Sequence, residues 1–303
     1  MSISVSTFGQ SNYLTSQILQ LEAGYNNSSV QEASGLKSQD FAGIAGDSQN
    51  VLNLESQHQQ LNTETTNATG AQSQVNTISS TLSNIGSVVT QALSNLSSAI
   101  SNSNNTALTG GTVAQLQTDL SEITGSLNAQ YAGNYLFGGS NINTPPVNIN
   151  ATGYTALDPN ISNTSYYQGD STIDSVQVND SFAISYGITA DNPAFEQALR
   201  GLTLAIASPN DQTMLQQAYG LLQQASGGVA NLTATTSAKS TILGDQITVN
   251  QTALNYLNSN ISDLTNADTT QVAVQLSAMQ SQLNASYSVM SKLFSLSLTS
   301  FLK

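Results

Sequence analysis

The sequence contains no cysteine, no tryptophan and only one histidine. The lack of cysteine excludes thiolate catalysis and cysteine-based zinc sites. The single histidine, His58, supports neither a Ser–His–Asp site nor a zinc cluster, and its place on an apolar helix stripe favours a packing role. We therefore expect a protein that is not an enzyme and that has no cofactor and no metal site.

Charged residues are also scarce. They make up 8% of the chain, against about 25% in typical soluble domains. The net charge is -13, and the only cations are Lys37, Arg200, Lys239, Lys292 and Lys303. No basic stripe can neutralise phosphates, so neither nucleic-acid binding nor attachment to an anionic membrane is expected. A polar but uncharged surface is better suited to lying against another protein.

Long hydrophobic runs are missing as well. No stretch approaches the ~18 apolar residues of a membrane span. The first 20 residues lack the basic region and the apolar core of a cleaved secretory signal. We therefore expect no membrane insertion, and a chain that either stays in the cytoplasm or leaves by a route without a cleaved signal.

Both ends of the chain carry apolar residues at helical spacing. A single helix cannot bury such a stripe by itself, so these two helices need partners. The candidate assembly interface consists of Leu14, Ile18 and Leu21 near the N-terminus and Leu276, Met279, Leu283, Tyr287, Met290 and Phe294 near the C-terminus.

The stretch between the ends is also mostly helical. A stripe with steps of three and four runs from near Ile44 to Ile100, which indicates a coiled-coil-like helix. A polar turn at 102–111 and a second stripe from Val113 to Tyr131 predict an antiparallel helix hairpin. Helical spacing resumes near Asn192, where Pro193 is a start signal, and continues to Leu264.

Residues 138–191 have a different pattern. Glycine and proline punctuate the segment, and the runs at 175–178 and 182–186 predict short strands. Three carboxylates there, Asp170, Asp174 and Asp180, lack the neighbours of a glycosidase site, so we interpret them as solvated turn and edge-strand acids. The pair Glu196 and Arg200, which follows the segment at helical i,i+4 spacing, is predicted to be a surface ion pair.

The boundary of this segment is crowded with large apolar residues. Two glycines follow them and predict a helix C-cap with positive φ. The crowding predicts the junction where the insert packs on the helices. The junction residues are Tyr135, Leu136, Phe137, Gly138 and Gly139.

The predicted fold is mainly α with a small β-rich insert, in an elongated coiled-coil-like helical bundle built from both termini with the insert at its tip. We expect three parts: terminal helices at 1–40 and 265–303, a helical rod at 41–137 and 192–264, and the β-rich insert at 138–191.

The C-terminal region contains one further pattern, in polar as well as apolar positions: Ile261–Leu264, Ala267–Asp268, Leu276, Gln280, Leu283, Ala285–Tyr287 and Leu296–Leu298. This pattern resembles the C-terminus of the flagellin family. The connector Ser34–Lys37, with Asp40 and Ala42–Ala45, resembles the corresponding N-terminal segment of that family. It is shorter here, and Phe41 replaces an acidic residue of the family pattern.

The middle of the chain carries four further segments of this kind: Tyr135–Gly139, Thr144–Pro146, Tyr167–Asp170 and Ala190–Glu196. They resemble one branch of this family, the hook-associated proteins at the hook–filament junction. Some short flagellins carry the same middle, so a subunit of the filament itself is the alternative. A secreted adhesin whose insert binds a glycan is the alternative from another class, and an enzyme is the most remote.

The resemblance implies a structural subunit of the bacterial flagellum that supports motility. Its termini would pack as coiled coils with copies of itself and would stay disordered until assembly. Its other partners would be hook-associated proteins, flagellin and an export chaperone. It would be secreted through the flagellar export channel, without a cleaved signal peptide, to the extracellular flagellum.

Overall fold

The computed structural model describes residues 2–101, 107–179 and 181–301. These residues form two compact units. The terminal unit comprises residues 1–59 and 254–303, and the central unit comprises residues 60–253. Two long helices, α2 (Ser48–Ile100) and α5 (Gln212–Thr265), contribute to both units. Six α-helices and two small antiparallel sheets occur in the described residues, which confirms the prediction of a mainly α chain with a small β-rich insert.

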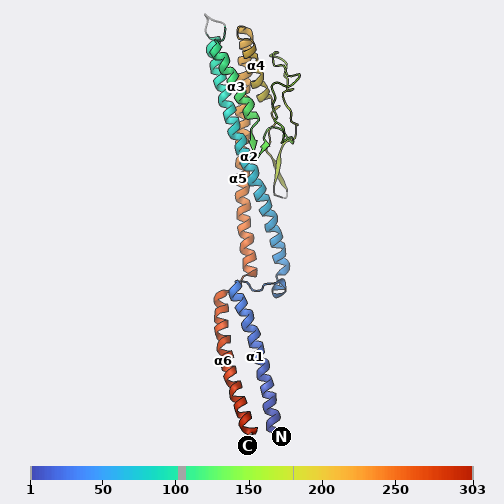
Figure 1. Ribbon diagram of the computed structural model, residues 1–303, viewed down its shortest axis with the longest axis vertical. Coiled ribbons are helices and arrows are strands. Elements are labelled where there is room, and N and C mark those ends of the chain that lie inside the picture. Colours follow the sequence, from blue (N-terminus) through green and yellow to red (C-terminus); the bar gives the residue numbers. More distant parts are fainter. Residues whose placement is uncertain (1, 102–106, 180, 302–303) are drawn as a thin grey trace. The chain divides into compact units, whose positions relative to one another are not determined.

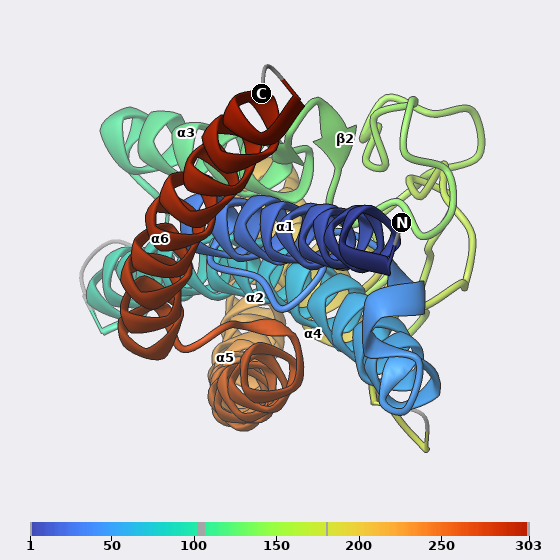
Figure 2. The same cartoon turned by 90° about the horizontal axis from the view of Figure 1, so that it is seen from below.

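The terminal unit is built from the two ends of the chain. Helix α1 (Ser2–Ser34) and helix α6 (Thr269–Phe301) pack against each other and are neighbours in both views (Figure 1, Figure 2). A short 3-10 helix, η1 (Phe41–Ile44), lies in the connector that leads from α1 to α2. Helix α2 begins at Ser48, four residues later than the stripe predicts, because η1 and a turn occupy residues 41–47.

In the central unit α2 and α5 run in opposite directions (Figure 1). A Cβ on Gly86 would lie 3.5 Å from Cγ1 of Val229, and the Gln72 side-chain amide donates to the carbonyl of Ser240. The residue numbers therefore rise along one helix as they fall along the other. The hydroxyl of Ser240 also donates to the side-chain oxygen of Asn76 at 2.6 Å.

Uncharged polar residues cover the outer faces of these helices. Hydroxyls such as those of Thr69, Ser73 and Thr77 donate to the carbonyl four residues earlier. These bonds satisfy the hydroxyls within the helix itself. The helices therefore need few charged side chains to present a polar surface.

Two shorter helices complete the helical core. Helix α3 (Gly110–Leu127) returns along α2, and the side-chain amide of Asn84 on α2 donates to the hydroxyl of Ser126 on α3, as the predicted hairpin requires. Residues 102–106 of the predicted turn lie outside the described residues. Helix α4 (Pro193–Ala207) packs on α3 and begins at the predicted start signal. Its N-cap, Asn192, accepts a hydrogen bond from the Ala194 amide at 3.0 Å.

The strands of the described residues lie in the insert and just before it. The strands β1 (Gln130–Tyr131) and β2 (Asn134–Tyr135) pair around a turn with positive φ at both central residues, Ala132 and Gly133. The strands β3 (Ser175–Asn179) and β4 (Phe182–Ser185) lie where the sequence predicts short strands, and the structure pairs them antiparallel. This second hairpin packs on α2 and α5 and forms a small core of Ala68, Ala71, Val75, Val178, Ile184, Tyr186 and Leu243.

The main core lies between α2, α3, α4, α5 and the start of the insert. Its largest fully buried side chains are those of Ile78, Leu82, Ile85, Leu96, Leu116, Ile123, Leu127, Phe137, Tyr166, Phe195, Leu199 and Leu202.

Candidate assembly interface

The apolar stripes of α1 and α6 bring the two ends of the chain together. Ile18 on α1 and Leu283 on α6 are 5% and 8% exposed, respectively. Gly24 faces Met279, whose Cε lies 3.5 Å from the position a Cβ on Gly24 would take. The Tyr287 hydroxyl donates to the carboxylate of Glu22, and this hydrogen bond raises the pKa of Tyr287. The two helices are therefore held by one hydrogen bond and by a strip of apolar contacts around Ile18, Met279 and Leu283, which we call the seam.

The seam does not bury all the predicted interface residues. Leu14, Leu21, Leu276, Met279 and Met290 are half-buried. Tyr287 is exposed despite its hydrogen bond, and Phe294 is 59% exposed. Two helices alone can cover only one narrow stripe of each other. The structure thus brings the nine predicted residues onto one helix pair but leaves part of their surface open.

Further large apolar side chains lie outside the seam. Tyr13, Leu19 and Val30 of α1 are exposed, and so are Val274 and Val289 of α6. Leu19 is 59% exposed. Scattered exposed apolar residues are ordinary, but here they recur along both helices of one pair. The α1–α6 pair therefore presents apolar surface beyond what it buries.

The connectors of these helices are joined by hydrogen bonds. Leu36, after α1, forms an antiparallel bridge with Asn266, after α5. The Ala267 amide donates to the Gly35 carbonyl at 2.8 Å, and the Lys37 amide donates to the Thr265 carbonyl at 2.7 Å. Gly35 takes a φ of +70°, which favours glycine. The Lys37 ammonium also donates to the carbonyls of Asp263 and Leu264, so the first connector caps the end of α5.

The next turn of the connector, from Ser38 to Gly43, is held by side-chain hydrogen bonds and is closely packed. The carboxylate of Asp40 accepts hydrogen bonds from the Gly43 amide at 3.0 Å and from the Ser38 hydroxyl at 3.1 Å. These bonds, first that from Gly43, lower the pKa of Asp40. A Cβ on Gly43 would lie 2.1 Å from the Ser38 hydroxyl oxygen, so this position requires glycine.

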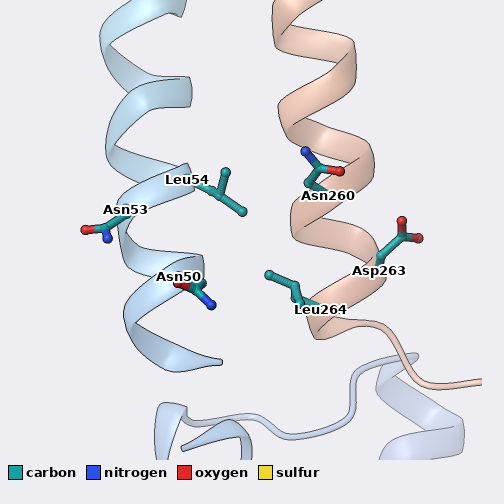
Figure 3. Close-up of a pocket in the computed structure, with 6 residues that line it drawn as sticks. All are labelled: Asn50, Asn53, Leu54, Asn260, Asp263 and Leu264. Atoms are coloured by element: carbon teal, nitrogen blue, oxygen red, sulfur yellow. The ribbon is translucent and has the colours of Figure 1, made fainter. Parts of the chain in front are cut away.

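A cavity of about 410 Å³ lies between the first turns of α2 and the last turns of α5 (Figure 3). Leu54 and Leu264 point towards each other across it. The remaining lining residues are polar: Asn50, Asn53, Asn260 and Asp263. This lining holds one carboxylate and no second titratable group, so it offers no acid–base pair.

The predicted insert junction lies at the main core. Leu136, Phe137 and Gly138 are buried, and the Phe137 ring meets the Phe195 ring of α4 edge-on, with centroids 5.9 Å apart. The Ala190 amide donates to the Phe137 carbonyl at 2.9 Å. Both ends of the insert therefore meet at this residue.

The prediction that Gly138 and Gly139 cap a helix is wrong. Helix α3 ends at Leu127, and the β1–β2 turn intervenes. The positive φ occurs at Gly139, +67°, for another reason. The Asp170 carboxylate would lie 2.3 Å from a Cβ there, and the Asn141 carbonyl would lie 2.5 Å from a Cβ on Gly138. Both glycines thus permit close approach of backbone inside the insert.

Two of the insert's acidic residues, Asp170 and Asp174, accept hydrogen bonds from different parts of the fold. The carboxylate of Asp170 accepts hydrogen bonds from the Ser140 hydroxyl and amide and from the Thr172 amide, which hold the pKa of Asp170 well below its usual range. Asp174 accepts from the side-chain amide of Gln74 at 3.2 Å. Asp180 lies outside the described residues.

Glu196 and Arg200 form the predicted ion pair, but its predicted surface location is wrong. Two guanidinium nitrogens of Arg200 lie 2.9 and 3.1 Å from the two carboxylate oxygens of Glu196. The side chains are 7% and 3% exposed, because the insert loop covers them. Arg200 also donates to the Pro159 carbonyl, and Glu196 accepts from the Asn163 amide. The pair therefore fastens the insert to α4.

Sequence reasoning missed the role of Lys37. The one signal available was its position: it is the only cation in the first 199 residues, and it lies two residues after Gly35, where a striped helix ends. The carbonyls that it binds are 226 and 227 residues away in the sequence, so no local pattern could identify them.

Residues 2–101, 107–179 and 181–301 hold no group of three or more histidine, cysteine, aspartate or glutamate side chains placed to bind a metal ion. Among the helices of the same residues, none combines the length and the apolar character that crossing a membrane requires.

No protein-family model and no curated protein matches this sequence. Solved structures do match it. One, from Vibrio parahaemolyticus and described as a flagellar hook-associated protein, has 16% identity and a TM-score of 0.62 over 75% of this chain and 99% of its own. Another, flagellar hook-associated protein 3 from Legionella pneumophila, has 13% identity and a TM-score of 0.54 over 70% of this chain and 98% of its own.

The chain has the fold of flagellar hook-associated proteins. The likeness covers nearly the whole of both solved chains and about three quarters of this one. It agrees with the resemblance in the sequence, which rests on different observations, namely the residue patterns of the C-terminus and of the insert.

Proposed function

We propose that this chain is a structural subunit of the bacterial flagellum that self-assembles through α1 and α6. The observation that carries the proposal is the apolar surface that this helix pair leaves open, including Leu19, Val274 and Phe294. Contact with a second copy would remove that surface from water, which is favourable in proportion to the area buried. The shared fold with flagellar hook-associated proteins supports the flagellar setting.

Within the flagellum, we place the chain at the hook–filament junction. The support is the residue pattern of the insert, above all Tyr135–Gly139 and Tyr167–Asp170, which resembles the junction branch of the family. The partners would then be copies of itself, other hook-associated proteins and flagellin, with an export chaperone before secretion. The location would be the extracellular flagellum, reached by the flagellar export route, and the cellular role would be motility.

Matched variants test the assembly surface. Leu19 on α1 and Leu157 in the insert have nearly the same exposure, 59% and 57%. Neither Leu19→Gln nor Leu157→Gln should change the stability of the free chain by more than about 0.5 kcal/mol, because both side chains are largely exposed. We expect Leu19→Gln to slow assembly onto isolated hooks at least about tenfold, while Leu157→Gln behaves as the wild type.

Sedimentation and electron microscopy would measure that assembly. Equal assembly of both variants would show that the open surface of α1 is not an interface. Glycan binding that the Leu157→Gln variant loses, in a chain that does not assemble, would instead favour a secreted adhesin.

Gene deletion tests the position in the flagellum. If the chain joins hook to filament, cells without it should make hooks that lack filaments and should lose flagellin to the medium. Complementation with the Leu157→Gln variant should restore filaments, and complementation with the Leu19→Gln variant should not. Hooks with normal filaments in the deletion strain would contradict the junction role, and long filaments formed by this chain alone would favour the filament subunit.

A further inference from the structure

The end of α5 is completed by a residue from the other end of the chain. An α-helix leaves its last four carbonyls without partners inside the helix. In α5 these are the carbonyls of residues 262–265. The Asn266 amide donates to the first of them, at Ser262, with a distance of 2.8 Å. Lys37 supplies the donors for the other three: its ammonium lies 2.7 Å from the Asp263 carbonyl and 2.9 Å from the Leu264 carbonyl, and its amide lies 2.7 Å from the Thr265 carbonyl.

The same residue is tied back to α1. The side-chain amide of Gln31 donates to the Lys37 carbonyl at 2.8 Å. Gly35, in turn, accepts from the Ala267 amide, which lies two residues before α6 begins. The exit from α1 and the entry to α6 are therefore held by one set of hydrogen bonds, with Lys37 at its centre.

The charge of Lys37 suits this position. The carbonyl end of a helix carries a partial negative charge of about half an elementary charge, so a cation there is stabilising. An ammonium group has three donors, and two of them are used on α5 carbonyls. A neutral side chain of the same length could keep the packing of the stem but would leave both carbonyls to solvent.

We propose that Lys37 is a positioning residue that makes the ordering of α1 and α6 interdependent. This inference rests on the proposed function, because an interdependent pair presents the apolar surfaces of both helices together to a second copy. When the hydrogen bonds from Lys37 to the α5 carbonyls are lost, the connector before α6 is freed together with the connector after α1. The apolar residues of α6 then lose their fixed relation to those of α1, and assembly slows.

Hydrogen exchange on the full free chain directly tests whether the Lys37 hydrogen bonds hold the two connectors. Lys37→Met keeps the length of the side chain and removes its charge. We expect about tenfold faster exchange at the Ala267 amide and through the first turns of α6, more than 200 residues from the substitution, with no change in α3 and α4. Lys37→Arg should restore most of the protection, and Lys292→Met, an exposed cation on α6 itself, should change nothing at Ala267. Unchanged exchange in the Lys37→Met variant would overturn the proposal. Wild-type exchange at Ala267 as fast as in an unfolded peptide, the result expected if the ends stay disordered until assembly, would overturn it for the free chain as well.

Assembly of the same variants onto isolated hooks supplies the second readout. Slow assembly of Lys37→Met with normal assembly of Lys37→Arg would support the positioning role. Wild-type rates in Lys37→Met, in spite of faster exchange, would overturn that role. Failure of the wild-type chain to assemble at all would refute the proposed function instead, and the exchange data would still decide whether Lys37 couples the two helices.

Discussion

Removal of the Arg200 guanidinium is predicted to be among the most costly single changes in the central unit. In the Arg200→Met variant the carboxylate of Glu196 stays 3% exposed and loses both of its guanidinium hydrogen bonds. Breaking one side of such a buried pair costs about 3–5 kcal/mol, because an uncompensated charge remains inside the protein. For a unit of this size, that loss corresponds to a fall of roughly 6–20 °C in Tm.

A double-mutant cycle separates the pair from its surroundings. Replacing both residues, Arg200→Met with Glu196→Leu, removes the buried charges together and should recover at least half of the loss. Recovery should be incomplete, because the Asn163 amide and the Pro159 carbonyl also lose their partners in the insert. An unpaired buried group costs about 1–3 kcal/mol.

Urea and thermal unfolding followed by circular dichroism would measure these differences. Lys292→Met removes an exposed cation and is the matched control, with an expected effect under about 0.5 kcal/mol. If Arg200→Met lost less than about 1 kcal/mol, or if the double variant were no more stable than the single one, the pair would be solvated and not a buried ion pair.

Two further predictions concern the other buried groups. Burial raises the pKa of Asp119, with a smaller contribution from Glu122 and an opposing hydrogen bond from Gln115, so the folded state holds its proton to higher pH than the unfolded state. Stability should fall as pH rises from the ordinary aspartate value through the raised one. Asp119→Asn should remove that loss in urea titrations at several pH values, and a constant difference at every pH would contradict it. Leu283→Asp places a charge in the α1–α6 seam and should abolish assembly, while α2 to α5 stay folded by hydrogen exchange; undiminished assembly would mean that the seam is not needed.

Local sequence pattern was enough to predict most helices and the strands β3 and β4, but not that these two strands pair. An apolar stripe such as the one from Val51 to Leu96 depends on residues three or four positions apart, and the start signal at Asn192 and Pro193 depends on adjacent ones. The helices that they mark can therefore be predicted from local sequence alone. The nine predicted interface residues lie on the α1–α6 pair for the same reason, since an apolar stripe identifies the helix face that packs against another surface.

The sequence could not show which side chains would be buried, or which distant segments would pack against them. Glu196 and Arg200 have the spacing of a surface pair, but a loop about 40 residues earlier in the chain buries them. Gly139 has the positive φ expected of a helix cap, although the close approach of Asp170 is what requires it.

Residue type and local spacing therefore set the helical elements, the scarcity of charge and the apolar stripes, and these could be predicted before the fold was known. The fold alone showed that Lys37 completes α5 and that Leu19 is exposed. The carbonyls that Lys37 binds and the groups that leave Leu19 uncovered are set by contacts between segments more than 200 residues apart, and helical periodicity carries no information over that separation.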